Sequence, residues 1–253
     1  MNFYSSILFF LMLCVFNLNA QKSINITDAK GLKQGPWIKF NPKTNKVIYK
    51  GQFKDNKPVG IFRYYFEELD TIKTLMDFRK DGKSAFAQIY HLNSVIKAKG
   101  KYTNEKKDSL WNFYDEGGKL LSVENYQNGL REGKSIIYYT EGNILEEGNY
   151  KNDKKNGSIK QFYPDKQLKM ESTYKDGIMI GKNAFYYPNG MLANIGYLNE
   201  KGNKFGVWLS KDKEGKGNRW CHWRCSDQGR FLSALLLKKT LLSKHCQSLR
   251  EEL

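Results

Sequence analysis

Aromatic residues return about every 24 positions over most of this chain. One series has steps of 23 to 25 residues and comprises Phe53, Phe78, Tyr102, Tyr126, Tyr150, Tyr174 and Tyr197. A second has steps of 24 or 25 residues and comprises Tyr65, Tyr90, Tyr114, Tyr139, Tyr163 and Tyr187. A third series is small and comprises Gly35, Gly60, Ser84, Ser109, Gly133, Gly157, Gly181 and Gly206. Three series with one period predict about seven tandem units, each packed mainly on its neighbours.

The two aromatic series alternate every 10 to 13 residues, which predicts two short strands per unit, separated by turns. One turn carries Asn128-Gly129, and the other follows an aromatic pair, as in Pro188-Asn189-Gly190. Asn-Gly supplies positive φ and Pro fixes φ, so both sequences favour tight turns. We therefore predict an all-β fold: an elongated, single-layer antiparallel β-meander of about seven hairpin repeats over residues 31–212, after a linker at 21–30.

Adjacent aromatics in the central repeats are the candidate binding residues: Tyr138, Tyr139, Phe162, Tyr163, Tyr186 and Tyr187. Neighbouring residues on a strand point to opposite faces, so these pairs predict two aromatic stripes. Either both stripes form the core of a thin sheet, or the wetter one binds a peptide or sugar rings. The register slips by one residue along the chain, so the sequence leaves open which series faces outward.

The pattern Tyr-x-Asn-Gly-x-x-x-Gly, followed by an aromatic pair and Pro-Asn-Gly, resembles the bacterial MORN-repeat variant. It is clearest at Tyr126 to Gly142, Tyr150 to Gly157 and Tyr174 to Gly190. Arrays of this kind are often described as antitoxin-like proteins of the YwqK type. The resemblance implies a curved single-layer sheet that contacts proteins or lipids and has no catalytic residues of its own.

The first 20 residues carry no charge and include the apolar run from Ile7 to Phe16. This short apolar stretch ends at Ala20 and is typical of a secretory signal peptide, so we expect an exported protein in the periplasm, at the cell surface or in the medium. The alternative is an uncleaved membrane anchor. An antitoxin role fits export poorly, because such antitoxins act in the cytoplasm.

The net charge is +16, which is compatible with an anionic polymer or membrane surface as partner. Only seven of the 42 basic residues are Arg, the side chain that forks onto phosphates, so we expect no specific nucleic-acid partner. The other interpretation is a solvated Lys-rich exterior that keeps a Tyr-rich sheet soluble and blocks pairing at its edges.

The composition changes in residues 213–253, a basic tail that contains three cysteines. The leucines in 229–249 recur with a helical period and predict a short C-terminal helix that covers an open sheet edge. A shift of reading frame would explain the same break. Weak candidates for zinc ligands are Cys221, His222, Cys225 and Cys246, but their spacing matches no zinc pattern and we expect no metal or other cofactor.

Catalysis is not predicted, because the array lacks a nucleophile or metal motif and its single His, His91, follows a strand in a turn. The favoured function is a non-enzymatic scaffold that binds another protein. The alternatives are a polyanion- or glycan-binding module that uses Lys-rich turns and outward Tyr residues, and an antitoxin-like protein that neutralises a toxin.

Overall fold

The structure is a computed structural model that describes residues 23–67 and 69–222. The chain divides into two compact units, Met1–Ser94 and Val95–Leu253, which are described separately. The predicted signal peptide, the predicted helix at 229–249, Cys225 and Cys246 lie outside the described residues. The described residues contain strands and turns but no helix, and hence none that could cross a membrane.

The first unit is an antiparallel meander in which each strand from β1 to β6 pairs with the next. Its strands are β1 (Ile26–Thr27), β2 (Lys33–Phe40), β3 (Val47–Lys54), β4 (Lys57–Tyr65), β5 (Ile72–Phe78) and β6 (Ser84–Tyr90).

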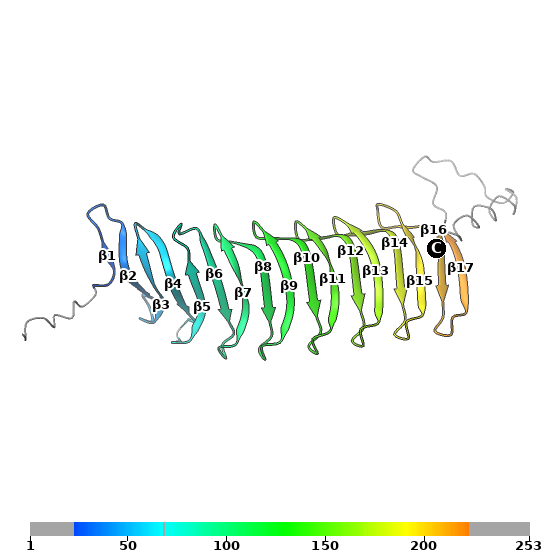
Figure 1. Ribbon diagram of the computed structural model, residues 1–253, viewed down its shortest axis with the longest axis horizontal. Helices are drawn as coiled ribbons and strands as arrows, with labels where there is room; N and C mark the ends of the chain where they lie inside the picture. The colour runs from blue at the N-terminus through cyan, green and yellow to red at the C-terminus, as the bar shows by residue number, and fades with distance from the viewer. Residues whose placement is uncertain (1–22, 68, 223–253) are drawn as a thin grey trace, which may run out of the picture. The chain divides into compact units, whose positions relative to one another are not determined.

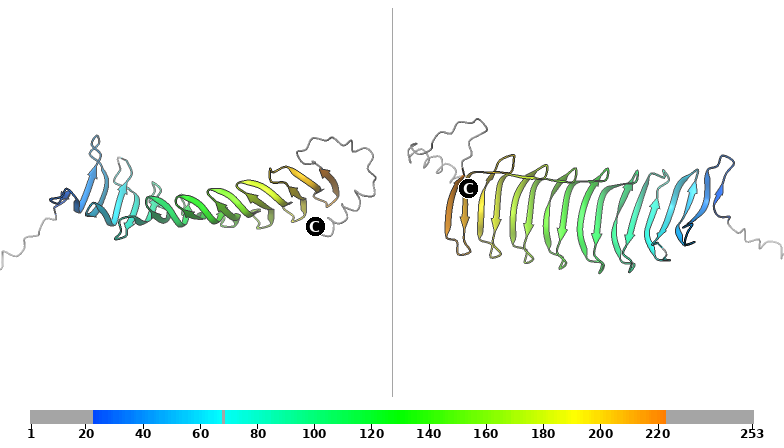
Figure 2. Two further views of the ribbon diagram at one scale, coloured as in Figure 1. Left: turned by 90° about the horizontal axis from the view of Figure 1, so that it is seen from above. Right: turned by 180° about the vertical axis from the view of Figure 1, so that it is seen from behind.

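The second unit continues the same pattern from β7 to β17, again with every strand antiparallel to the next. Its strands are β7 (Ile96–Thr103), β8 (Lys106–Tyr114), β9 (Leu120–Gln127), β10 (Leu130–Tyr138), β11 (Ile144–Lys151), β12 (Lys154–Phe162), β13 (Leu168–Lys175), β14 (Ile178–Tyr186), β15 (Leu192–Leu198), β16 (Lys204–Lys211) and β17 (Gly217–His222). Figure 1 shows these strands side by side, and both views in Figure 2 show them as a single layer. The predicted all-β meander of hairpin repeats is confirmed.

The turns explain the small-residue series. Gln127 pairs with Leu130 across a two-residue turn, in which Asn128 and Gly129 have φ of 53° and 89°. Such turns need positive φ, which Asn and Gly adopt most readily. Further along β10, Gly133 also has positive φ, 87°, and the pairing with β9 slips between Arg131 and Ser135. The small residue is therefore the site of a β-bulge.

The core has a second period, of two repeats, that the sequence analysis missed. In every second repeat a large side chain covers a glycine on the preceding strand, as Trp111 covers Gly100 and Ile159 covers Gly148. A Cβ on either glycine would overlap that side chain. The equivalent pairs are Gly51 with Phe62 and Gly196 with Trp208. The repeats between them hold the pairs Met76 with Ala87, Glu124 with Ser135, and Ser172 with Asn183. Volume is thus complementary across each strand pair, so a single layer can bury its largest side chains.

Strands extend beyond both predicted ends of the array. β1 lies in the segment expected to be a linker, because Asn25 and its neighbours pair with the edge of β2. The Asn25 side chain donates to the carbonyl of Ile38 and accepts from its N–H, so it satisfies this edge as a strand would. β17 lies in the predicted tail and includes the backbone of Cys221 and His222.

Candidate binding surfaces

The two faces of the second unit differ, and we define them by their residues. The packed face carries Trp111 and Ile159, both 0% exposed. Alternation along each strand puts their immediate neighbours on the opposite, outer face. Cross-strand partners on the outer face include Ile136 with Glu147 and Lys160 with Glu171.

The first aromatic of each predicted pair lies on the outer face. Tyr138, Phe162 and Tyr186 end their strands, three residues after the buried Ser135, Ile159 and Asn183. Each faces an aliphatic residue across the hairpin, and together with the preceding repeat they form what we call the outer stripe. The outer stripe comprises the pairs Tyr114–Leu120, Tyr138–Ile144, Phe162–Leu168 and Tyr186–Leu192. All eight side chains are half-buried, so each presents apolar surface to solvent.

A lysine on the outer face supports this placement. The Nζ of Lys99 lies 5.5 Å from the ring centre of Tyr114. Lys99 pairs with Asn112, next to the packed-face pair Gly100 and Trp111, so it must lie on the outer face. In the first unit, Lys50 approaches the Tyr65 ring in the same way, at 5.7 Å.

The second aromatic of each pair connects successive repeats. The hydroxyl of Tyr139 donates to the carbonyl of Phe162, and that of Tyr163 to the carbonyl of Tyr186, both at 2.9 Å. Tyr187 donates to the carbonyl of Lys211 at 2.9 Å. The six candidate residues therefore divide by geometry: Tyr139, Tyr163 and Tyr187 form a hydroxyl ladder, whereas Tyr138, Phe162 and Tyr186 lie in the outer stripe.

The packed face carries a row of cations stacked on tyrosines. The Arg131 guanidinium carbon lies 4.2 Å from the centre of the Tyr150 ring, and Lys155 Nζ lies 5.5 Å from that of Tyr174. In the preceding repeat, Lys107 Nζ lies 4.8 Å from Tyr126 and approaches Trp111 and Phe113 as well. Each cation occupies the second strand position, two residues before the positive-φ residue, so the repeat itself generates the row.

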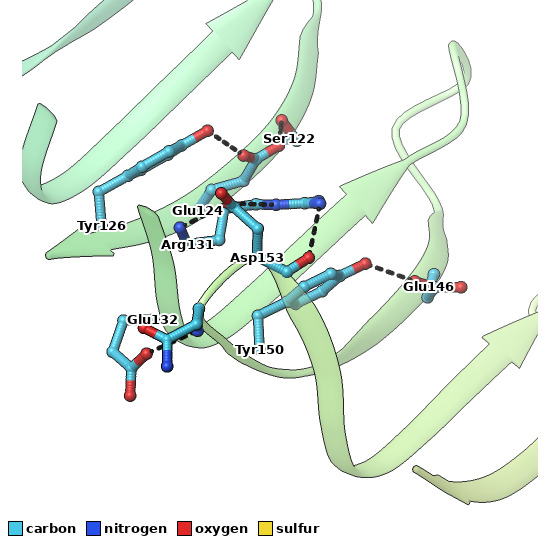
Figure 3. A network of polar contacts seen from close by, with 9 residues as sticks. Ser122, Glu124, Tyr126, Arg131, Glu132, Glu146, Tyr150 and Asp153 are labelled. Atoms are coloured by element: carbon cyan, nitrogen blue, oxygen red, sulfur yellow. Dashed lines mark hydrogen bonds and ion pairs between the residues drawn. The ribbon is translucent and has the colours of Figure 1, made fainter. Parts of the chain in front are cut away.

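Carboxylates on the same face neutralise these cations. Glu146 is only 5% exposed and accepts hydrogen bonds from Tyr150 Oη at 3.2 Å, Lys155 Nζ at 2.6 Å and Gln161 Nε2 at 2.7 Å. Glu124 accepts from Ser122 Oγ at 2.8 Å and Tyr126 Oη at 2.7 Å. Figure 3 shows both tyrosine–glutamate contacts. Because buried charge is costly unless paired, this network belongs to the fold.

Arg131 ties the network to the turn between β11 and β12. Its backbone N–H donates to Asp153 Oδ1 at 2.8 Å, and its guanidinium donates to the Asp153 carbonyl at 3.3 Å (Figure 3). The Nε of Arg131 also lies 3.5 Å from Asp153 Oδ1. Beside it, the N–H of Asn152 donates to Glu132 at 3.0 Å. Side chains of one repeat thus hold the turn of the next.

The strands that carry this network match a known repeat. Residues 107–128, 131–152 and 155–176 each match the model of the MORN repeat variant. Three consecutive repeats are MORN-like. Each matched segment begins at a stacked cation, Lys107, Arg131 or Lys155, and contains the tyrosine beneath it. The curated proteins contain no match to the chain.

The ionisable groups of the MORN-like repeats are not tuned for proton transfer near neutral pH. Burial, together with the nearby Glu146, raises the pKa of Tyr150 to about 12. Burial and the hydrogen bond to Glu124 raise the pKa of Tyr126 in the same direction. Burial lowers the pKa of Lys107, and Glu124 and Asp153 oppose that shift. Both hydroxyls stay protonated near neutrality, where a general base must release its proton.

Within residues 23–67 and 69–222, no group of three or more His, Cys, Asp or Glu side chains is arranged to hold a metal ion. The weak zinc candidates are not tested by this observation. Only the backbone of Cys221 and His222 is described, in β17, and Cys225 and Cys246 fall beyond it.

Proposed function

We propose that this protein is a non-catalytic repeat scaffold that binds another protein through the outer stripe of its second unit. The observation that carries the proposal is the stripe itself, four aromatic–aliphatic pairs at a regular spacing on one face, each half-exposed. Aromatic side chains dominate the binding energy of protein interfaces, because they bury a large area at low entropic cost.

The packed face is the weaker candidate because its groups already have partners within the chain. Glu146 has three donors, and Arg131 and Lys155 each have both a ring and a carboxylate. A ligand would have to break these contacts, and removing one partner of a buried pair is costly.

The charges of the outer face favour a protein over a polyanion. Lys134 lies 3.7 Å from Glu147, and Lys160 lies 3.4 Å from Glu171, so both signs alternate across the strands. A polyanion would meet carboxylates at regular intervals along this face. Its binding would also weaken steeply with salt, whereas aromatic contacts to a protein would change little.

Site-specific photocrosslinking in the native host tests the proposal. A benzoylphenylalanine placed at Tyr138 or Tyr186 should give a discrete adduct with one protein, identified by mass spectrometry. The same group at Phe86, an exposed aromatic of the first unit, is the matched control. The proposal fails if the stripe positions give no adduct, or if Phe86 gives the same adduct in equal yield.

Export is part of the proposal and is supported by the uncharged, apolar first 20 residues. Cell fractionation with intact-mass analysis should find a protein that begins at Gln21 outside the cytoplasm. A full-length cytoplasmic protein would contradict export and favour the antitoxin-like alternative.

A further inference from the structure

We propose that the outer stripe binds a proline-rich segment of the partner in the polyproline-II conformation, running across the strands with three ligand residues per hairpin repeat. This inference rests on the proposed function and names the partner's chemistry. Three observations carry it: the spacing of the stripe aromatics, the aliphatic residues between them, and the carboxylates beside them.

The spacing follows from the sheet. The stripe aromatics Tyr114, Tyr138, Phe162 and Tyr186 end strands β8, β10, β12 and β14, so one strand separates each from the next. Neighbouring strands lie about 4.8 Å apart, which places successive aromatics at intervals of about 9.6 Å.

Among regular peptide conformations, polyproline II matches this interval best. Its three residues per turn rise about 9.3 Å, so the mismatch over three intervals is only about 1 Å. An extended strand repeats on one face every about 6.7 Å, which fits no interval. An α-helix returns to the same face after seven residues, about 10.5 Å, so its mismatch reaches about 3 Å over three intervals.

The surface between the aromatics suits such a ligand. Leu120, Ile144, Leu168 and Leu192 pair with the stripe aromatics across each hairpin and so lie at the same level of the sheet. Aromatic-lined surfaces recognise polyproline II because the ligand is already ordered and its rings pack flat on aromatic faces. One ligand side chain per turn would meet each aromatic–aliphatic pair.

Charge specifies the ends of the ligand. Glu147 and Glu171 occupy, two and three repeats later, the position from which Lys99 reaches the Tyr114 ring. Their side chains are 31% and 47% exposed, and each holds only a surface ion pair, which contributes little. An arginine of the ligand can therefore stack on Tyr186 while it pairs with Glu171. The ligand we infer is proline-rich, apolar at every third residue and basic at one end.

Fluorescence anisotropy with peptides of defined period tests this inference. The probe is a labelled peptide of four Pro-Pro-Leu triplets with Arg at each end, and the control is an alternating Pro-Leu peptide of equal length and charge. We expect the three-residue period to bind the full chain at least tenfold more tightly than the two-residue period. Equal affinity for the two peptides would overturn the inference.

Variants locate the binding. The triple variant Tyr138→Ala/Phe162→Ala/Tyr186→Ala should lose binding at least tenfold, with circular dichroism confirming that it is folded, whereas Phe86→Ala should bind normally. Glu171→Gln should weaken the Arg-ended peptide severalfold and leave a peptide without Arg unaffected. Binding that survives the triple variant would contradict the site. If photocrosslinking at Tyr138 succeeds but the triplet peptide does not bind, the proposed function stands and this inference falls.

Discussion

The hydroxyl of Tyr163 donates to the main-chain carbonyl of Tyr186 at 2.9 Å, across 23 residues of sequence. With the equivalent bonds of Tyr139 and Tyr187, it connects each hairpin to the next at the turn edge of the sheet. In a repeat array each unit contacts only its neighbours, so such bonds contribute directly to the cooperativity of unfolding.

Replacing Tyr163 with Phe should therefore lower the free energy of unfolding by about 1 kcal/mol, because it removes one hydrogen bond and keeps the ring. Chemical denaturation measures the change. Tyr138→Phe is the matched control, since the outer-stripe ring remains and no hydroxyl of the ladder is lost. An equal loss in both variants would contradict the ladder.

Gly148→Ala should destabilise the protein by about 1–3 kcal/mol, because the new Cβ overlaps Ile159. Ile159→Ala alone should cost about 2–5 kcal/mol through the cavity it leaves. The double variant should lose less than the sum of the two, since each change relieves the other. Strict additivity in denaturation would show that these side chains do not compete for the same space.

Glu146→Ala should cost about 1–3 kcal/mol, because the donors on Tyr150, Lys155 and Gln161 lose their acceptor. Glu147→Ala, one residue along on the outer face, is the control and should change stability by less than about 1 kcal/mol. Equal effects at the two positions would show that Glu146 is not a structural carboxylate.

Alkaline pH should weaken the fold through Tyr150, whose pKa rises from 10.0 to about 12 on folding. The raised pKa means that the unfolded chain releases this proton first. The stability contribution is therefore complete below pH 10 and is lost as pH rises from 10 to 12. Tyr150→Phe should flatten this part of the curve of unfolding free energy against pH. An unchanged slope would contradict the shift.

Much of the fold could be predicted from sequence because the repeat exposes its own period. The spacing of Tyr126, Tyr150 and Tyr174 predicts the strands, and the glycines mark the bulges. The alternation of large and small core residues was also legible, since Gly100 and Gly148 are 48 residues apart, yet a search at one period passes over it.

The candidate surfaces could be predicted only in part. The central aromatic pairs were identified, but which member faces outward depends on the register shift at each hairpin, as between Ile137 and Tyr138. The network around Glu146 brings together Lys155 and Gln161, which lie 9 and 15 residues away in sequence. Such contacts follow from cross-strand register, which short-range spacing does not determine.

The most direct test compares the two faces in the same assays. The outer-stripe triple variant and the packed-face variant Ile159→Ala would each be measured for unfolding free energy and for crosslinking from Leu168, a stripe position left intact in both. We predict that the triple variant stays stable but loses the crosslinked partner, whereas Ile159→Ala loses stability and keeps its partner while folded. A triple variant that unfolds, or one that keeps its partner, would contradict the assignment of fold to one face and binding to the other.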